Sequence, residues 1–249
     1  MPTNRHGKTT GVYLAGFNAS PFFNSYESAR TVDTHETTPF ESNDKTYSVG
    51  LNDGTASLSG FYDVAAAGLG GDELLDALYN QGADFPMSVF LDGGVVVGRA
   101  ARMAQVNQTS YAVSAAVGDM ITTKADLTVD GGIRYGKCLN AKAPITGTVT
   151  GAPADFGLPG GLGDFLDTAN GFAHIHPIAN TRNTATDVKI QQSADTSVWV
   201  DHATFSVPAG STAAVAIPTT GANLRYVRAL ITPVAGTGSA TIIVAFARA

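Results

Sequence analysis

Apolar and polar residues alternate in many short runs along this chain. Successive side chains of a strand point to opposite faces, so a period of two residues predicts strands. The runs predict about a dozen short strands, and the clearest are GVYLAGF, TASLSGFYD, PMSVFL, VVVGRAARMAQV, MITTKADLTV, IRYGKCL, FAHIHPI, DVKIQQS, SVWVDHATFSV, LRYVRALITPV and ATIIVAFARA. The pattern therefore predicts an all-β fold, a sandwich or barrel with long loops.

One pair of runs predicts a hairpin over residues 45–63. KTYSVG is followed by NDG, a turn signal, and then by TASLSGFYD. Within the last run Ala56, Leu58, Gly60 and Tyr62 share one face, and we expect Leu58 to lie in the core.

A single stretch has helical spacing, GDELLDALYNQG over residues 71–82. Its leucines recur on one face, with Asp72 as the expected N-cap and Gly82 as the expected stop. This predicts one α-helix on the flank of the β structure.

The remaining segments are expected to be loops or an arm. Residues 1–10 are polar and predict a flexible N-terminal arm. Residues 19–45 and 151–171 alternate poorly and are rich in proline, glycine or polar residues, so we expect two long loops there. Nothing in the pattern separates a second domain, and residues 1–249 are read as one.

The composition narrows the possible partners. Charged residues make up 14% of the chain, the net charge is −6, and no run of Lys or Arg occurs. Tight binding of nucleic acid is therefore not expected, although an acidic wall would let nucleic acid slide past without sticking. The N-terminus lacks the apolar core of a signal peptide and no long apolar run occurs, so we expect a soluble protein made in the cytoplasm.

Several residues could carry chemistry, but none belongs to a catalytic motif. Asp33, His35 and Glu36 are suitable metal ligands by type, and His174 and His176 would share one face of a strand. A polar loop and a pair of packed imidazoles are the simpler readings of these two groups. The lone Cys138 is expected to be a buried small hydrophobe. We predict no enzyme activity, no cofactor and no metal.

An aromatic and basic stretch near the C-terminus predicts core packing and ion pairs. Trp199 lies between Val198 and Val200, so we place it in the core together with Leu58 and Tyr226. Arg225 and Arg228 would then pair with Asp195, Asp201 or a neighbouring subunit.

Two separated stretches resemble the major tail tube proteins of long-tailed bacteriophages. SARTVDTHETTPFESNDKTYSVGLNDGTASLSGFYD carries their loop, turn and strand signature, and FAHIHP, VKIQQSADTSVWVDHATF and LRYVRA are similar to their closing half in phages of actinobacteria and relatives. The resemblance covers residues 10–65 and 170–249. Glu41 departs from it, because Gly is expected after the Phe.

The resemblance implies a β-barrel or sandwich subunit that assembles into stacked hexameric rings forming a tube for genome DNA. It implies a virion location in the tail, and partners that include tape measure, terminator and distal tail proteins. Residues of an expected assembly loop feed the barrel; they are Asp33, Thr34, His35, Glu36, Thr38 and Phe40.

Other functions stay open at this point. The SAD, Trp and RYVR pattern also looks like a carbohydrate-binding jelly roll of the discoidin type, which would expose aromatics. A metal hydrolase would use His174 and His176. A tube subunit of a tail-derived particle, such as a gene transfer agent or a bacteriocin, has the same sequence signature as a phage protein.

Overall fold

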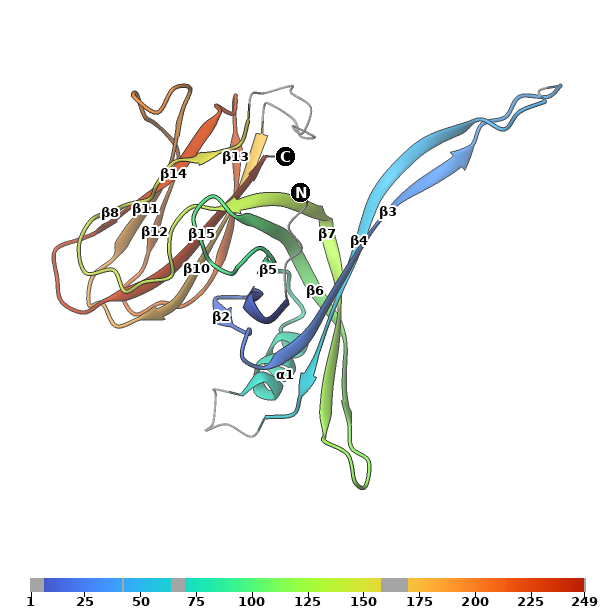
Figure 1. The fold of residues 1–249 in the computed structure, drawn as a ribbon, viewed down its shortest axis with the longest axis horizontal. Coiled ribbons are helices and arrows are strands. Elements are labelled where there is room, and N and C mark those ends of the chain that lie inside the picture. Colours follow the sequence, from blue (N-terminus) through green and yellow to red (C-terminus); the bar gives the residue numbers. More distant parts are fainter. Residues whose placement is uncertain (1–6, 42, 64–69, 158–169, 249) are drawn as a thin grey trace. The chain divides into compact units, whose positions relative to one another are not determined.

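The computed structural model describes residues 7–41, 43–63, 70–157 and 170–248. Within these residues fifteen strands and one α-helix are present, and the strand pairs are antiparallel (Figure 1). The prediction of an all-β fold with a single helix is confirmed. In the part of the chain that is described, no helix is long and apolar enough to cross a membrane.

The chain divides into two compact units. Unit 1 consists of residues 1–21, 85–103 and 134–249, and unit 2 of residues 22–84 and 104–133. Two strands, β6 and β7, run from one unit into the other. Whether the whole chain folds as one domain stays a prediction.

Unit 1 contains two antiparallel sheets. One has the order β13-β10-β15-β7-β6-β5-β1-β2, and the other has the order β12-β11-β14-β8 with β9 also on β14. The elements are η1 Gly7–Thr9, β1 Gly11–Leu14, β2 Phe17–Asn18, β5 Phe85–Phe90, β6 Ala100–Ser114, β7 Thr122–Cys138, β8 Val149–Thr150, β9 Ala154–Asp155, β10 Asn170–Asn180, β11 Thr186–Ser193, β12 Val200–Val207, β13 Val215–Thr220, β14 Tyr226–Pro233 and β15 Ala240–Arg248.

The core of unit 1 lies between these two sheets. Ile175 of β10 and Val244 of β15 belong to one buried cluster with Ile190 of β11 and Ile231 of β14. The next residues along β10 and β15 face the other way and are buried as well, among them Ile243. β10 and β15 therefore read as nearly continuous apolar runs, as strands covered on both faces do.

Unit 2 contains the remaining strands of the first sheet, which has ten strands in all, and the helix. Its strands are β3 Phe23–Glu36, β4 Tyr47–Phe61 and the adjoining parts of β6 and β7, and its helix is α1 Gly71–Gln81. β4 lies between β3 and β7. Burial alternates along β4, where Ala56 and Leu58 are buried, and α1 buries Leu75 and Leu78. Leu58 thus lies in the core, where the sequence placed it.

The ends of α1 agree with the predicted stop and disagree with the predicted cap. Gly82 has φ 59° and ends the helix in the left-handed conformation that glycine adopts without a steric penalty. The N-cap is Gly70 and it makes no side-chain capping bond, while Asp72 lies in the first turn. A carboxylate in the first turn still interacts favourably with the positive end of the helix dipole.

One predicted turn is a strand in the structure. NDG does not turn the chain, because β4 runs through it and Asp53 pairs with Thr31 of β3. A Cβ atom on Gly54 would lie 3.3 Å from Val129, so glycine gives this neighbour room.

The predicted loops are corrected in part. Residues 23–36 of the expected loop 19–45 form β3, because they pair along β4 for almost their full length. Residues 154–155 of the expected loop 151–171 form β9, and residues 158–169 lie outside the described part of the chain. Of the expected N-terminal arm, residues 7–9 form a 3₁₀ turn and residues 1–6 lie outside that part too.

Replacing Leu58 tests the core of unit 2. The side chain is 0% exposed, so Leu58→Ala should lower the free energy of unfolding by about 2–5 kcal/mol through lost burial and the remaining cavity. Ser57→Ala, on the opposite face of the same strand, should change it by no more than about 0.5 kcal/mol. Urea denaturation of both variants measures the difference, and equal effects would contradict the assigned faces.

Candidate assembly surface

The most prominent feature of unit 2 is a long two-stranded hairpin made by β3, β4 and the turn between them (Figure 1). β7 pairs with β4 only over Thr55–Phe61. The outer part of β4, Tyr47–Gly54, therefore pairs with β3 alone. We call residues 23–61 the long hairpin.

The turn of the long hairpin is held by a few polar contacts. The amide of Thr37 donates to the Thr46 carbonyl at 2.8 Å, and the Lys45 ammonium donates to the Glu36 carboxylate at 3.0 Å. Glu41 has φ 68°. This is the left-handed region that favours glycine, and it is the position at which the resembling proteins are expected to have Gly.

The residues expected in an assembly loop are divided between strand and turn. Four of them lie in β3 and two in the turn; they are Asp33, Thr34, His35, Glu36, Thr38 and Phe40. The Phe40 side chain is 102% exposed. Successive side chains of a strand point to opposite faces, so Glu36 does not converge with Asp33 and His35 on a metal. Among the described residues, no group of three or more His, Cys, Asp and Glu side chains could hold one.

The strand register shows that the core face of β4 continues onto the exposed part of the hairpin. Directly paired residues of antiparallel strands share a face, and Leu58 pairs with Tyr26 of β3. Steps of two along β3 from Tyr26 lead to Val32, Thr34 and Glu36.

Beyond a bulge in β4 the partners of Thr34 and Glu36 are Val49 and Tyr47. Val32, Tyr47 and Val49 are 45%, 57% and 75% exposed. We call these three residues the apolar stripe. The apolar stripe continues the core face into a region where its side chains are exposed.

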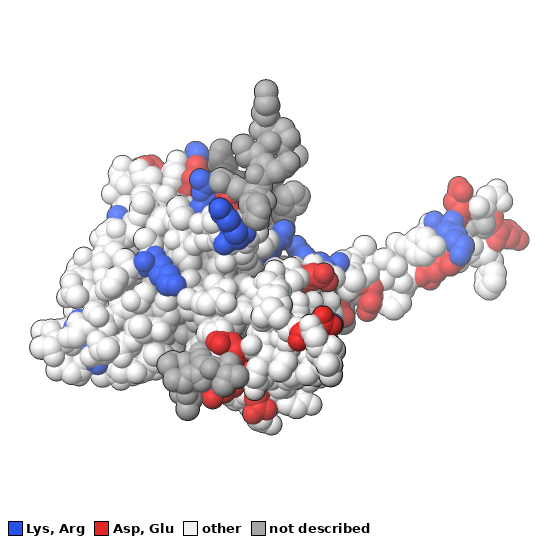
Figure 2. All heavy atoms as spheres, turned by 60° about the horizontal axis from the view of Figure 1, so that its bottom comes forward, with Lys and Arg blue, Asp and Glu red and all other residues white. Residues whose placement is uncertain are grey.

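Acidic residues gather on the same hairpin. Figure 2 shows Asp and Glu side chains along the extension at its right. The long hairpin contains six of them, which are Glu27, Asp33, Glu36, Glu41, Asp44 and Asp53, against two basic residues, Arg30 and Lys45. The long hairpin is therefore acidic and partly apolar.

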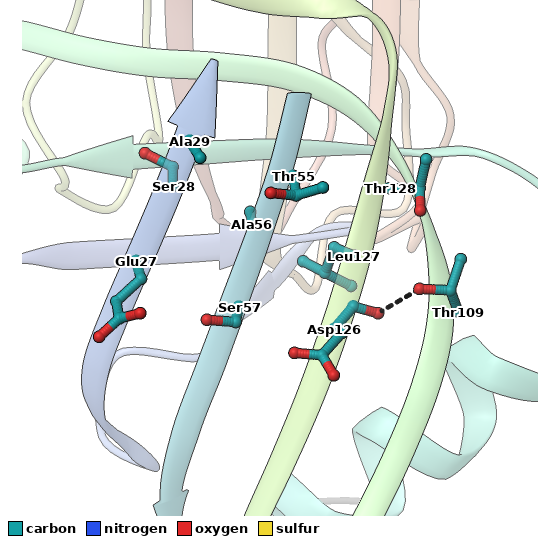
Figure 3. Close-up of a pocket in the computed structure, with 10 residues that line it drawn as sticks. All are labelled: Glu27, Ser28, Ala29, Thr55, Ala56, Ser57, Thr109, Asp126, Leu127 and Thr128. Atoms are coloured by element: carbon teal, nitrogen blue, oxygen red, sulfur yellow. Dashed lines mark hydrogen bonds between the residues drawn. The ribbon is translucent and has the colours of Figure 1, made fainter. Parts of the chain in front are cut away.

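The opposite face of the sheet is polar and slightly hollowed (Figure 3). Glu27, Ser57 and Asp126 form one row across β3, β4 and β7. The hollow has a volume of about 390 Å³ and is lined mainly by Ser, Thr and carboxylate side chains. The Ser110 hydroxyl, donating at 2.7 Å, and the Lys124 ammonium keep the pKa of Asp126 below its usual value.

A second hairpin, between β6 and β7, also exposes apolar residues. Val117 and Met120 are 108% and 67% exposed, and Val113 and Ile121 are exposed as well. Unit 2 therefore presents apolar side chains at the tips of two hairpins. Exposed groups of this kind mark sites of interaction.

The weak metal candidates His174 and His176 lie on β10 in unit 1 and contact Ser88 of β5. The Ser88 hydroxyl is 2.9 Å from His174 Nδ1 and 2.9 Å from His176 Nε2. All three residues are fully buried. Burial lowers the pKa of His176 to about 3 and the pKa of His174 well below 6.5. The two imidazoles are therefore neutral packing groups that share one hydroxyl.

The predicted core positions of Trp199 and Tyr226 are wrong. Trp199 precedes β12 and is half-buried. Its indole N–H donates to the Thr196 carbonyl, and the Arg228 guanidinium lies 4.0 Å from the centre of its ring. Tyr226 is also half-buried. Trp199 thus has one ring face covered by the Arg228 guanidinium.

Among the described residues, neither Arg225 nor Arg228 forms a salt bridge with Asp195 or Asp201, and pairing with a neighbouring subunit stays a prediction. Arg225 forms two bonds of 2.9 and 2.8 Å to the Asp155 carboxylate, and this pairing holds the pKa of Asp155 at about 2. Asp201 pairs with Lys189 instead. Asp155 lies in β9, inside the expected loop, so sequence spacing gave no reason to choose it.

The buried histidines predict an acid-sensitive unit 1. Both are neutral when folded and have a pKa near 6.5 when unfolded, so the unfolded chain binds more protons below pH 6.5. The free energy of unfolding is unaffected by them above that pH and should fall as the pH drops toward 3, by up to about 1.4 kcal/mol per pH unit for each histidine.

Urea denaturation at several pH values measures this slope. His174→Gln combined with His176→Gln should reduce the slope, and His35→Gln, a matched change at an exposed histidine, should leave it unchanged. A slope that the double variant retains in full would contradict the assignment.

Comparisons with known proteins found similarities among solved structures. No family model and no curated protein matches it. A chain in the virion of a native gene transfer agent particle is 14% identical with a TM-score of 0.42, over 53% of this chain and 98% of that chain. A chain of the anti-feeding prophage cap, which terminates its tube, is 14% identical with a TM-score of 0.44, over 55% and 93%.

The SPP1 tail tube structure gives similar values. Its identity is 12% and its TM-score is 0.42, over 53% of this chain and 78% of that chain. At these identities and TM-scores, the similarities carry no conclusion about the function of this chain.

Proposed function

We propose that this protein is the structural subunit of a tail tube, in a long-tailed bacteriophage or in a tail-derived particle. Copies of the chain assemble into rings, six to a ring as the sequence resemblance implies, and the rings stack into a conduit for genome DNA. The observation that carries this proposal is the long hairpin, which leaves its sheet and exposes a continuation of the core face.

The long hairpin is a poor structure for an isolated subunit. A two-stranded ribbon is at best marginally stable in water, and it gains stability from a third strand or from packing on its apolar face. Burying one Val or Leu side chain contributes about 1.5–3 kcal/mol. The three residues of the apolar stripe, together with Leu51 and Phe40, offer several such contributions to a neighbouring copy.

An open strand edge supports the same proposal. Among the described residues, β3 pairs only with β4, so one edge of a 14-residue strand has no partner strand. Such an edge presents backbone donors and acceptors that another chain can pair with. Edge-to-edge pairing around a ring would join the sheets of unit 2 into a continuous barrel.

The polar face of this sheet suits the wall of a DNA conduit. It carries short hydroxyl side chains and the carboxylates Glu27 and Asp126, and its one lysine, Lys124, is paired with Asp126 at 3.1 Å. Phosphates are held by rows of Lys and Arg, and carboxylates repel them. We therefore assign this face to the lumen, where DNA passes without binding.

The remaining properties follow from this role. The protein is synthesised in the host cytoplasm and is located in the virion tail, where tape measure, terminator and distal tail proteins are its neighbours. It acts without enzyme activity, cofactor or metal.

Electron microscopy of the purified protein over a concentration series tests the proposal. We expect rings or tubes with a central hole, in a fraction that grows with concentration. Monomers and dimers under every assembly condition would overturn it.

Removing the tip of the long hairpin tests the role of residues 34–44. The deleted residues contain no buried side chain among those described, so the subunit should keep its β structure and its unfolding transition. Tube formation should be lost, because the turn, the exposed Phe40 and the strand partners of Tyr47 and Val49 are gone. Circular dichroism checks the fold and electron microscopy checks assembly; tubes formed as by the wild type would contradict the assignment.

A further inference from the structure

The charges of this chain are separated between its two units. Unit 2 contains fourteen Asp and Glu residues and three Lys and Arg residues, a net charge of −11. Unit 1 contains seven acidic and twelve basic residues, a net charge of +5. The overall charge of −6 hides this difference. Two copies therefore attract each other when unit 2 of one meets unit 1 of the other.

The acidic charge on the long hairpin is only partly neutralised within the chain. Glu36 pairs with Lys45 at the exposed turn. Among the described residues, Asp33 and Glu41 have no Lys or Arg within ion-pair distance. Both carboxylates are exposed; Asp33 lies in β3 and Glu41 lies in the turn of the hairpin.

Three cations of unit 1 lie over aromatic rings rather than beside carboxylates. Their charged groups lie 5.0 Å from the Tyr135 ring, 5.7 Å from the Tyr13 ring and 4.0 Å from the Trp199 ring, and they belong to Arg102, Lys142 and Arg228 respectively. In the described part of the chain, none of the three forms a salt bridge. An aromatic ring carries no net charge, so a cation that lies over it is not neutralised. Arg, Trp and Tyr are also the residues enriched at the centres of interfaces.

The apolar stripe supplies the non-polar part of the contact. Val32, Tyr47 and Val49 lie on one face of the hairpin, and Glu36, which pairs with Tyr47, shares that face. An apolar centre with a charged rim is the usual arrangement of a protein interface. Two hairpins facing each other would bring carboxylates together, so a symmetric hairpin-to-hairpin contact is disfavoured.

We propose that the long hairpin of one copy docks on unit 1 of a second copy, with the apolar stripe buried and Glu36 and Glu41 facing the cations of unit 1. This inference rests on the proposed function and deepens it by naming the two surfaces that meet. The contact joins different patches of the two copies, and such a contact continues from subunit to subunit and closes into rings or extends into filaments.

Charge reversal separates this contact from a general charge effect. Glu36→Lys and Glu41→Lys together should lower the assembled fraction by about tenfold or more, because cations would then face the cations of unit 1. Asp76→Lys and Asp84→Lys together make the same change in net charge at exposed positions of unit 2 outside the hairpin, and should leave assembly unchanged. Equal effects of the two double variants would overturn the proposal.

Cross-linking identifies the surface that the hairpin meets. Phe40→Cys is labelled with a maleimide benzophenone, and Cys138 stays unlabelled because it is fully buried and its pKa is raised to about 11. Labelled protein is assembled with ¹⁵N protein, irradiated and digested. We expect mixed-isotope cross-links from residue 40 to peptides of residues 85–103 or 134–249; cross-links confined to residues 22–84 and 104–133, or to the same copy, would overturn the proposal.

A second labelling site protects the test against a local effect of the substitution. Asn43→Cys lies in the same turn and is exposed. Assembly is scored by electron microscopy before irradiation. Wild-type protein that forms no rings or tubes would refute the proposed function, whereas tubes with cross-links only within unit 2 would refute this inference and leave the proposed function intact.

Discussion

The structure depends on one constraint, which is that β4 extends beyond its pairing with β7, the strand that supports it. β7 pairs with the last part of β4 and leaves the rest to β3 alone. Along this outer part the backbone bonds of the ribbon are satisfied, but one face continues the apolar pattern of the core without any cover from the described chain. A hairpin with these properties is stabilised when a partner supplies the missing layer.

Unit 1 shows the opposite condition, because two of its strands are covered on both faces. β10 and β15 have buried residues on both faces, and even two polar side chains of β10, His174 and His176, are enclosed. His174 and His176 tolerate this enclosure because they are neutral and share the Ser88 hydroxyl. A unit of this kind has little freedom to rearrange, so it can act as the rigid side of a contact whose other side is the long hairpin.

The strands and the helix could be predicted because their signals are local. The two-residue alternation located the C-terminal strands, and Gly82 located the end of α1. NDG failed as a turn signal since tertiary pairing outweighs the local preference: Asp53 pairs with Thr31, and Gly54 leaves room for Val129. The true turn, at residues 37–46, was hidden in a segment whose polar strand β3 has no alternation to reveal it.

The candidate surface was only partly visible in the sequence for a similar reason. The importance of residues 33–40 was expected from the resemblance, but the apolar stripe depends on a bulge in β4 that changes which residues share a face. Trp199 was misplaced because apolar neighbours suggested two covered faces, whereas Arg228 and the Thr196 carbonyl satisfy it at the surface. Cross-strand register and cation–aromatic contacts join residues that are far apart in the sequence, so they could not be predicted from local sequence patterns.

The acidic residues of the hairpin also bear on a hazard that its open edge creates. An exposed edge strand pairs readily with another copy of itself, which leads to disordered aggregation. β3 carries Glu27, Asp33 and Glu36, so two β3 edges brought together would place like charges near one another. The carboxylates that attract the basic unit of a neighbour therefore also oppose the pairing of two identical edges. In the proposed assembly, the acidic residues lie on the hairpin and the basic residues on unit 1. This separation favours contacts between hairpin and unit 1 and opposes contacts between two identical edges.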